Sequence, residues 1–235
     1  MAERPYTLLS CAMSLDGYLS GAAGEPLPLS NAADLDRVDG VRASCDAILV
    51  GATTVRHDNP RLLVRSTARQ DARLARGLPP SPTKVTVTAG GELDAGSAFF
   101  VAGDTTKLVY CASASLDRTR RRLGAVATVV EAGQPVDLRR VAEDLHARGV
   151  RRLLVEGGGT VHTQLLTADL VDELQVVVAP VFVGDSHARR FVGDGKFPWG
   201  PQRRAVLAAV RQLDDVVLLQ YALSARFCPD ALQEA

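Results

Sequence analysis

A glycine-rich stretch in the second half of the chain has the residue types that bind an anion. Residues 153–160 read Leu-Leu-Val-Glu-Gly-Gly-Gly-Thr. The pattern predicts a buried strand that ends in Glu156 and a helix that begins at Thr160, its potential cap. The first N–H groups of a helix have no partner inside the helix, so they can bind a phosphate. Glycine lets the main chain approach such a ligand closely. We therefore expect an anionic cofactor here.

A second stretch, residues 46–65, combines an apolar run with hydroxyl, acidic and basic side chains. The run predicts a short buried strand, followed by one helical turn that carries Thr54. Asp58 then precedes Asn-Pro, which indicates a sharp turn because proline forces its predecessor into extended geometry. Arg65 closes the stretch, and an arginine can donate two charge-assisted hydrogen bonds to one phosphate. Taken singly, Asp58 is also explained as a turn residue and Arg65 as a solvated surface charge.

A third stretch, Ala-Met-Ser-Leu-Asp-Gly at 12–17, is typical of a turn and says little alone. His162 lies in the helix predicted after the glycines, where it could reach a cofactor. The other histidines are expected on the surface, and no pair has metal-ligand spacing. No Cys-x-x-Cys pair occurs either, so we predict no metal site.

The bulk composition restricts the class of protein. The chain has 235 residues, 46% of them hydrophobic, with 27 basic and 27 acidic side chains and a formal net charge of zero. This balance indicates an ordinary globular protein and argues against a general nucleic-acid or membrane-surface binder. No apolar run approaches the roughly 18 residues that a membrane span needs. The N-terminus does not resemble a signal peptide, and four scattered cysteines suit free thiols, so we expect a cytoplasmic protein.

The elements that must position these residues alternate between strand and helix. Strands are predicted at 6–13, 46–51, 84–88, 107–111, 126–130, 152–155 and 173–179. Helices are predicted at 31–44, 53–57, 116–123, 138–148 and 160–167. Asn31 is the expected cap of the first helix, with Leu35, Val38 and Val41 on one face. An acidic turn at 213–215 predicts a closing β-hairpin over 204–223.

This order predicts an α/β fold. We expect one domain over 1–235 with a mostly parallel central sheet, helices on both faces and a C-terminal antiparallel hairpin. The Arg-, Ser- and Pro-rich residues 66–82 are predicted to be an exposed loop, and 225–235 a tail. In such sheets ligands bind beyond the carboxyl ends of the strands, where all three stretches fall.

Together the motifs resemble the pyrimidine reductase family of riboflavin biosynthesis. This family includes the reductase domain of the bifunctional deaminase-reductase and has a dihydrofolate reductase-like fold. Each motif alone is weakly specific, but their order over most of the chain is highly specific. The matching stretches are 12–17, 42–65, 153–166, 170–174 and 179–184.

The resemblance implies NADPH-dependent reduction of a ribosylamino-pyrimidine 5′-phosphate to the ribitylamino form, as in 5-amino-6-(5-phosphoribosylamino)uracil reductase, by a homodimer. The cofactor residues that it implies are Ala12, Thr54, Asp58, Gly158, Gly159, Thr160, Val161 and His162. The substrate residues that it implies are Arg42, Leu62, Arg65 and Glu156.

The expected reaction is a hydride transfer to C1 of the ribose, which also needs a proton donor. Asp58 and Glu156 are the acids that the pattern places at the cleft, although water could serve instead. Two alternatives remain open at this point: a dihydrofolate or other pteridine reductase (or a secondary-metabolism relative) on the same fold, and a non-catalytic nucleotide-binding regulatory paralogue. The residues also leave open whether the pyrimidine is aminated or deaminated.

Overall fold

The structure is a computed structural model that describes residues 3–21 and 27–228, and these form two compact units. The first unit contains the described residues of 1–6 and 39–154, and the second those of 7–38 and 155–231. The elements in chain order are β1 (Tyr6–Ser14), α1 (Ala32–Ala43), β2 (Ala47–Gly51), α2 (Ala52–Asp58), α3 (Thr67–Ala75), β3 (Thr83–Thr88), α4 (Ala98–Val101), β4 (Lys107–Cys111), the 3-10 helix η2 (Ser113–Ser115), α5 (Leu116–Leu123), β5 (Thr128–Glu131), α6 (Leu138–Ala147), β6 (Arg152–Gly157), α7 (Gly159–Thr167), β7 (Glu173–Ala179), β8 (Val206–Leu213) and β9 (Val216–Ala222).

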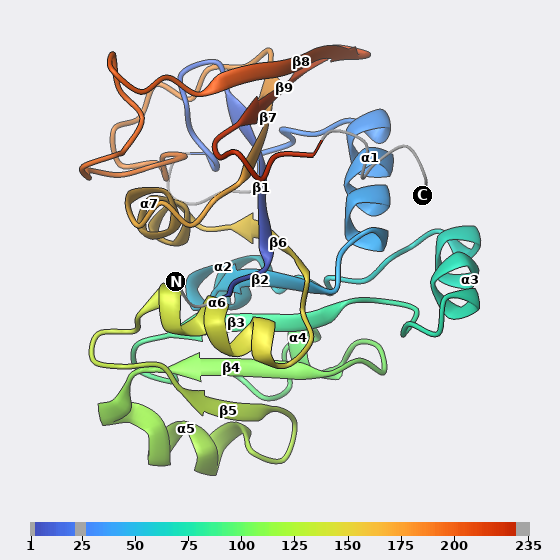
Figure 1. The fold of residues 1–235 in the computed structure, drawn as a ribbon, viewed down its shortest axis with the longest axis vertical. Helices are drawn as coiled ribbons and strands as arrows, with labels where there is room; N and C mark the ends of the chain where they lie inside the picture. The colour runs from blue at the N-terminus through green and yellow to red at the C-terminus, as the bar shows by residue number, and fades with distance from the viewer. Residues whose placement is uncertain (1–2, 22–26, 229–235) are drawn as a thin grey trace. The chain divides into compact units, whose positions relative to one another are not determined.

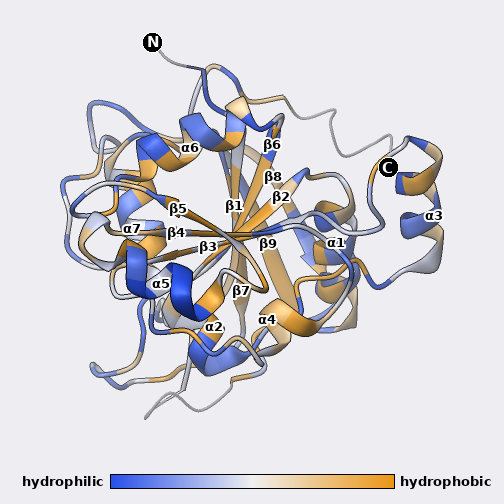
Figure 2. Ribbon diagram, turned by 90° about the horizontal axis from the view of Figure 1, so that it is seen from below, coloured by the Kyte–Doolittle hydropathy of each residue, from blue (hydrophilic) through white to orange (hydrophobic). Residues whose placement is uncertain are grey.

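The first unit is built on a parallel sheet with strand order β5-β4-β3-β2, next to which β6 begins. Every residue of β2 is buried, as expected for a parallel strand that is covered on both faces. Figures 1 and 2 show α6 on one face of this sheet and α2 and α4 on the other. Hydrophobic colouring follows the strands in Figure 2, whereas α5 is hydrophilic along its outer side.

The second unit contains the end of β6 and the strands β1, β7, β9 and β8, in that order. β1 and β7 are parallel, with Ala12 opposite Val177, and β9 is antiparallel to both β7 and β8. The hairpin between β8 and β9 turns at Asp214, which has a φ of 53°. In Figures 1 and 2, α7 and the first half of α1 lie on opposite sides of these strands. The predicted parallel α/β sheet with a C-terminal hairpin is therefore confirmed.

Most predicted element bounds agree with the structure to within two residues. The strands 107–111 and 173–179 and the helix 116–123 match throughout. Asn31 caps α1 as predicted, because its Oδ1 accepts from Asp34 N at 2.9 Å. The expectation of a single domain over 1–235 stays a prediction. The predicted tail is described only as far as residue 228.

The exposed loop predicted over 66–82 is wrong, because α3 occupies Thr67–Ala75. Ser66 is the N-cap, and its Oγ accepts from Arg69 N at 3.4 Å. Ala, Arg, Gln and Leu are good helix formers, so the arginine-rich composition favoured a helix and not a loop. Arg73 is buried, and its guanidinium donates to Ala43 O, Cys45 O and Pro79 O.

The apolar face predicted for the first helix is confirmed for Val41, which is buried, and is wrong for Leu35. Leu35 is 43% exposed, whereas Asp34 and Asp39 are buried on α1. Each of these acids has an arginine partner, which offsets the cost of burying its charge. The buried face of this helix therefore contains paired acids beside the apolar Val41, and hydrophobic periodicity does not detect such acids. Within the described part of the chain, every helix is too short or too polar to cross a membrane.

Candidate active site

The glycine turn leads into α7 as predicted, but the helix begins one residue earlier than expected. Gly158 is the N-cap, with a φ of 99°, and no side chain caps the helix. Thr160 is therefore not the cap and lies exposed in the first turn. A φ in this region is strained for any residue with a Cβ atom, which explains a glycine at this position. Because no described side chain caps α7, the N–H groups at its N-terminus can be offered to an anion.

Gly159 is needed for packing inside the second unit. A Cβ atom on Gly159 would lie 2.4 Å from the carbonyl oxygen of Arg190. Thr163, on the same helix, accepts at its Oγ1 from Gly193 N at 2.8 Å. The segment that follows residue 189 therefore packs directly on the start of α7. Gly159 is therefore required by this contact, independently of any ligand at the helix N-terminus.

His162 is fully buried beneath the same segment. Its Nδ1 lies 3.1 Å from Phe191 O, and the two rings are 5.5 Å apart. Because a carbonyl oxygen can only accept, Nδ1 is the protonated nitrogen of a neutral ring. Burial lowers the pKa of His162 from its ordinary value of 6.5 to about 4. The burial argues against the predicted cofactor contact through this side chain. Val161 beside it is buried as well.

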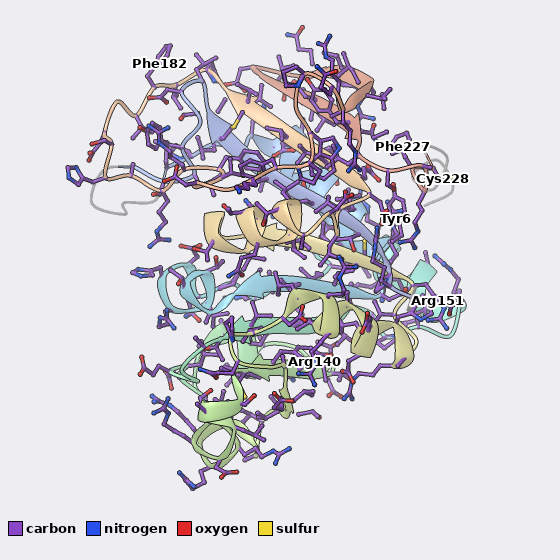
Figure 3. The ribbon with its side chains drawn as sticks, turned by 60° about the vertical axis from the view of Figure 1, so that its left-hand side comes forward. Tyr6, Arg140, Arg151, Phe182, Phe227 and Cys228 are labelled. Atoms are coloured by element: carbon purple, nitrogen blue, oxygen red, sulfur yellow. The ribbon has the colours of Figure 1, made fainter. Side chains whose placement is uncertain are left out.

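The stretch at 12–17 does more than form a turn. Ala12 lies in β1, half-buried, and packs against the apolar core of the second unit. Asp16 accepts from Ser14 Oγ at 2.6 Å and from the backbone N–H groups of Val183 and Gly184. The Ser14 hydrogen bond is the main cause that lowers the pKa of Asp16. Asp16 thus holds the loop after β7, on which Phe182 is 75% exposed (Figure 3).

Thr54 and Asp58 lie on α2, directly after the carboxyl end of β2 in the first unit. Thr54 is half-buried and Asp58 is exposed. The predicted turn follows, but the extended geometry expected before Pro60 is wrong, because Asn59 is left-handed with φ 43° and ψ 52°. Asn59 Oδ1 accepts from Ala98 N at 2.6 Å, which connects the turn to α4. The structure therefore places both residues at the strand end where ligands bind in such sheets.

The three first-unit residues predicted to bind substrate are brought together: Leu62 and Arg65 lie on one short segment, and Arg42, in the last turn of α1, reaches that segment. Arg42 Nη1 donates to Leu63 O at 3.2 Å. Leu62 is buried and has a φ of 49°, which is unusual for a branched side chain. Arg65 has a side chain that is 56% exposed, with Nε 3.7 Å from Asp39 Oδ1. Asp39 was not among the predicted site residues, because nothing local marks it as a partner of Arg65.

The predicted site residues are divided between the two units. The first unit holds Arg42, Thr54, Asp58, Leu62 and Arg65. The second holds Ala12, Glu156, Gly158, Gly159, Thr160, Val161 and His162. Glu156 is half-buried near the end of β6, one residue before Gly157. That the two sets form one site stays a prediction.

The sequence profile of the RibD C-terminal domain family matches residues 5–219. The chain belongs to this family. A relative from Methanothermobacter thermautotrophicus is 37% identical over 223 residues, which cover 94% of this chain and 99% of the relative. A relative from Archaeoglobus fulgidus is 37% identical over 182 residues, which cover 77% of this chain and 83% of the relative. Both are named 2,5-diamino-6-ribosylamino-4(3H)-pyrimidinone 5′-phosphate reductase. Membership of a riboflavin-biosynthesis reductase family is thereby confirmed.

Solved structures of the family share the fold. A pyrimidine reductase-like protein from Corynebacterium diphtheriae superimposes with a TM-score of 0.80 at 24% identity, over 94% of this chain and 92% of that one. RibD from Acinetobacter baumannii superimposes with a TM-score of 0.76 at 26% identity, over 93% of this chain and 58% of that one. These likenesses confirm the expected dihydrofolate reductase-like fold.

The redox chemistry of the family is consistent with a nicotinamide cofactor. The residues present fit such a group, because α7 begins at a glycine of positive φ without a side-chain cap. Thr160 is exposed at this helix end, where its N–H and hydroxyl can reach a phosphate. The described residues of this turn therefore offer hydrogen-bond donors to a pyrophosphate.

Proposed function

We propose that the protein is an NADPH-dependent reductase that converts a ribosylamino-pyrimidine 5′-phosphate to its ribitylamino form. The observation that carries the proposal is the 37% identity over 94% of the chain to a relative named as such a reductase. The names of the relatives favour the 2,5-diamino-pyrimidinone as substrate over the deaminated uracil. Beyond family membership, the protein is thus assigned a cofactor, a substrate and site residues.

The substrate phosphate is assigned to Arg65, with Leu62 on the same segment and Arg42 in the last turn of α1. The guanidinium of Arg65 is permanently charged and more than half exposed, so it can meet a dianionic phosphate. Arg42 holds Leu63 O, which keeps the segment close to the end of α1. A phosphorylated substrate suits this pair of arginines better than a folate, which supports the pyrimidine phosphate over a pteridine.

The chemical step requires a hydride at C1 of the ribose and a proton at the ring oxygen. The C1–oxygen bond breaks, the oxygen becomes a hydroxyl, and the pyrimidine nitrogen stays attached to C1. A bound nicotinamide dinucleotide would supply the hydride. Asp58 and Glu156 are the proposed proton donors. Asp58 is exposed at the end of α2, and Glu156 is half-buried near the end of β6.

The cofactor is assigned to the residues that the resemblance implies. Its pyrophosphate would meet the start of α7, at Gly158, Gly159 and Thr160, where the helix dipole also favours an anion. The proposed set is completed by Ala12, Thr54 and Asp58. Val161 and His162 also belong to it, as buried residues that support α7. We also propose that the protein uses NADPH in preference to NADH.

Steady-state oxidation of the reduced nicotinamide tests the proposal. The protein should oxidise NADPH with the diamino-pyrimidinone phosphate, and more slowly with its deaminated counterpart and with NADH. Turnover of dihydrofolate alone would overturn the proposal in favour of a pteridine reductase. NADPH binding without turnover of any of these compounds would favour a regulatory paralogue.

A homodimer and a cytoplasmic location are part of the same proposal. β8 is the last strand of the sheet order, and Val206, Leu207 and Val210 on it are each more than half exposed. An unpaired edge strand with apolar side chains is suited to pair with a second copy. Buried cysteines without disulfides, Cys45 and Cys111, suit a reducing compartment.

A further inference from the structure

The segment 62–66 lies outside the helices and strands, and its backbone is held by side chains and not by a neighbouring strand. We call residues 62–66 the presenting segment, because it carries Leu62 and Arg65. Five of its hydrogen bonds join a backbone group to a side chain elsewhere in the first unit. They run from Arg42 Nη1 to Leu63 O (3.2 Å), from Val64 N to Ser81 Oγ (3.0 Å), from Gln70 Nε2 to Val64 O (2.7 Å), from Arg65 N to Asp39 Oδ1 (2.6 Å) and from Ser66 N to Asp39 Oδ2 (3.1 Å).

Asp39 accepts two of these five hydrogen bonds, and each of the other side chains makes one. It is 2% exposed on α1, and its two oxygens accept from two consecutive backbone N–H groups of the presenting segment. The same carboxylate accepts from Arg69 Nη1 at 3.1 Å and lies 3.7 Å from Arg65 Nε. Hydrogen bonds to an ionised acceptor are roughly twice as strong as neutral ones. Asp39 therefore orients both the main chain and the side chain of Arg65.

The strained backbone of Leu62 supports a functional role for the presenting segment. Leu62 keeps a φ of 49° although it is not a glycine, a backbone conformation that is strained for a side chain of this size. Such strain persists only where surrounding contacts over-determine the conformation. The side-chain hydrogen bonds that begin at Leu63 provide those contacts.

We infer that Asp39 is a positioning residue, which holds Arg65 in the orientation that binds the substrate phosphate. The inference rests on the proposed function, because that function supplies the phosphate. Pre-organisation of this kind increases affinity, since less conformational freedom is lost on binding. An asparagine in place of Asp39 would point an N–H₂ group at one of the two backbone donors, so the orientation would be lost although the shape is kept.

A double-mutant cycle between Asp39→Asn and Arg65→Ala tests the inference. Asp39→Asn should raise KM for the phosphorylated substrate about tenfold, with a smaller change in kcat. In the Arg65→Ala background, Asp39→Asn should raise KM little further, because its effect acts through Arg65. Binding of ribose 5-phosphate, followed by calorimetry, should weaken in Asp39→Asn in parallel with KM.

Asp144→Asn is the matched control, because Asp144 accepts from Tyr110 Oη and Arg148 Nε in the same unit away from the presenting segment. It should leave KM unchanged. If Asp39→Asn does not fold, Asp39→Glu keeps the charge, displaces the carboxylate by one methylene and should raise KM in the same way.

An unchanged KM in a folded Asp39 variant would overturn the inference. So would an equal effect of Asp39→Asn with and without Arg65. A wild-type protein that turns over no pyrimidine phosphate and binds no ribose 5-phosphate would instead overturn the proposed function, and the inference with it.

Discussion

At the scale of single residues, Arg65 carries the proposed contact with the substrate phosphate. Arg65→Ala should weaken substrate binding by about 1.5–3 kcal/mol, the usual contribution of a hydrogen bond to a charged group. The loss should appear as a higher KM for the pyrimidine phosphate, measured by steady-state kinetics. Arg203→Ala is the control: its solvent-exposed pair with Asp169 contributes little to stability, and its loss should leave KM unchanged. An unaltered KM in Arg65→Ala would remove this residue from the site.

His162 predicts a pH dependence of stability. Its pKa in the folded protein is about 4, below the ordinary 6.5, because burial disfavours the charged ring. The unfolded chain therefore binds an additional proton as the pH falls from about 6.5 to about 4. Above pH 6.5 the neutral ring makes its full contribution to the free energy of unfolding. Between pH 6.5 and about 4 this contribution falls by about 1.4 kcal/mol per pH unit.

Chemical denaturation across this pH range measures the effect. His162→Asn keeps an N–H in place of Nδ1 for Phe191 O but does not titrate. The free energy of unfolding of the variant should therefore fall less steeply than that of the wild type. Equal slopes would show that His162 is not the group responsible, since carboxylates titrate in both proteins alike.

At the scale of elements, the start of α7 depends on close packing as well as on its glycine turn. Gly159→Ala would place a Cβ atom 2.4 Å from Arg190 O, and this backbone atom cannot simply rotate away. We expect a loss of about 1–3 kcal/mol in stability, as for other overpacked sites. Gly200→Ala has nothing within 4 Å of its new Cβ and should cost little. Thermal unfolding of the two variants compares them, and equal melting temperatures would contradict the packing argument.

The elements themselves were largely predictable, and the exceptions have physical causes. The sequence does not predict the helix over Thr67–Ala75, because its arginines suggest solvent, whereas Arg73 is buried against backbone carbonyl groups. The short helix α4 has four residues, too few for a periodic signal, and Ser97 at its N-cap makes no side-chain capping hydrogen bond. The hydrophobic pattern places Leu35 on the inner face of α1, but Asp34 is buried there, because an acid paired with an arginine can be buried.

At the scale of the whole molecule, the proposed homodimer should depend on the edge strand β8. Val210 is 56% exposed there, and Val210→Lys would place a charge in an apolar contact between copies. Light scattering after size-exclusion chromatography should show a shift from dimer towards monomer. Val101→Lys is the control, since Val101 is 65% exposed on α4 and a cation at a helix C-terminus is well tolerated. A dimer that survives Val210→Lys would place the interface elsewhere.

The sequence by itself determined the alternation of strands and helices, the glycine turn before α7 and the family of the chain. These are local signals, because periodicity, caps and turns depend on residues a few positions apart. Only the tertiary structure decided that Asp39 holds Arg65, 26 residues further along, and that His162 is buried against Phe191. Such pairs depend on how distant segments pack, and an aspartate or histidine has no local signature of the partner that it will meet.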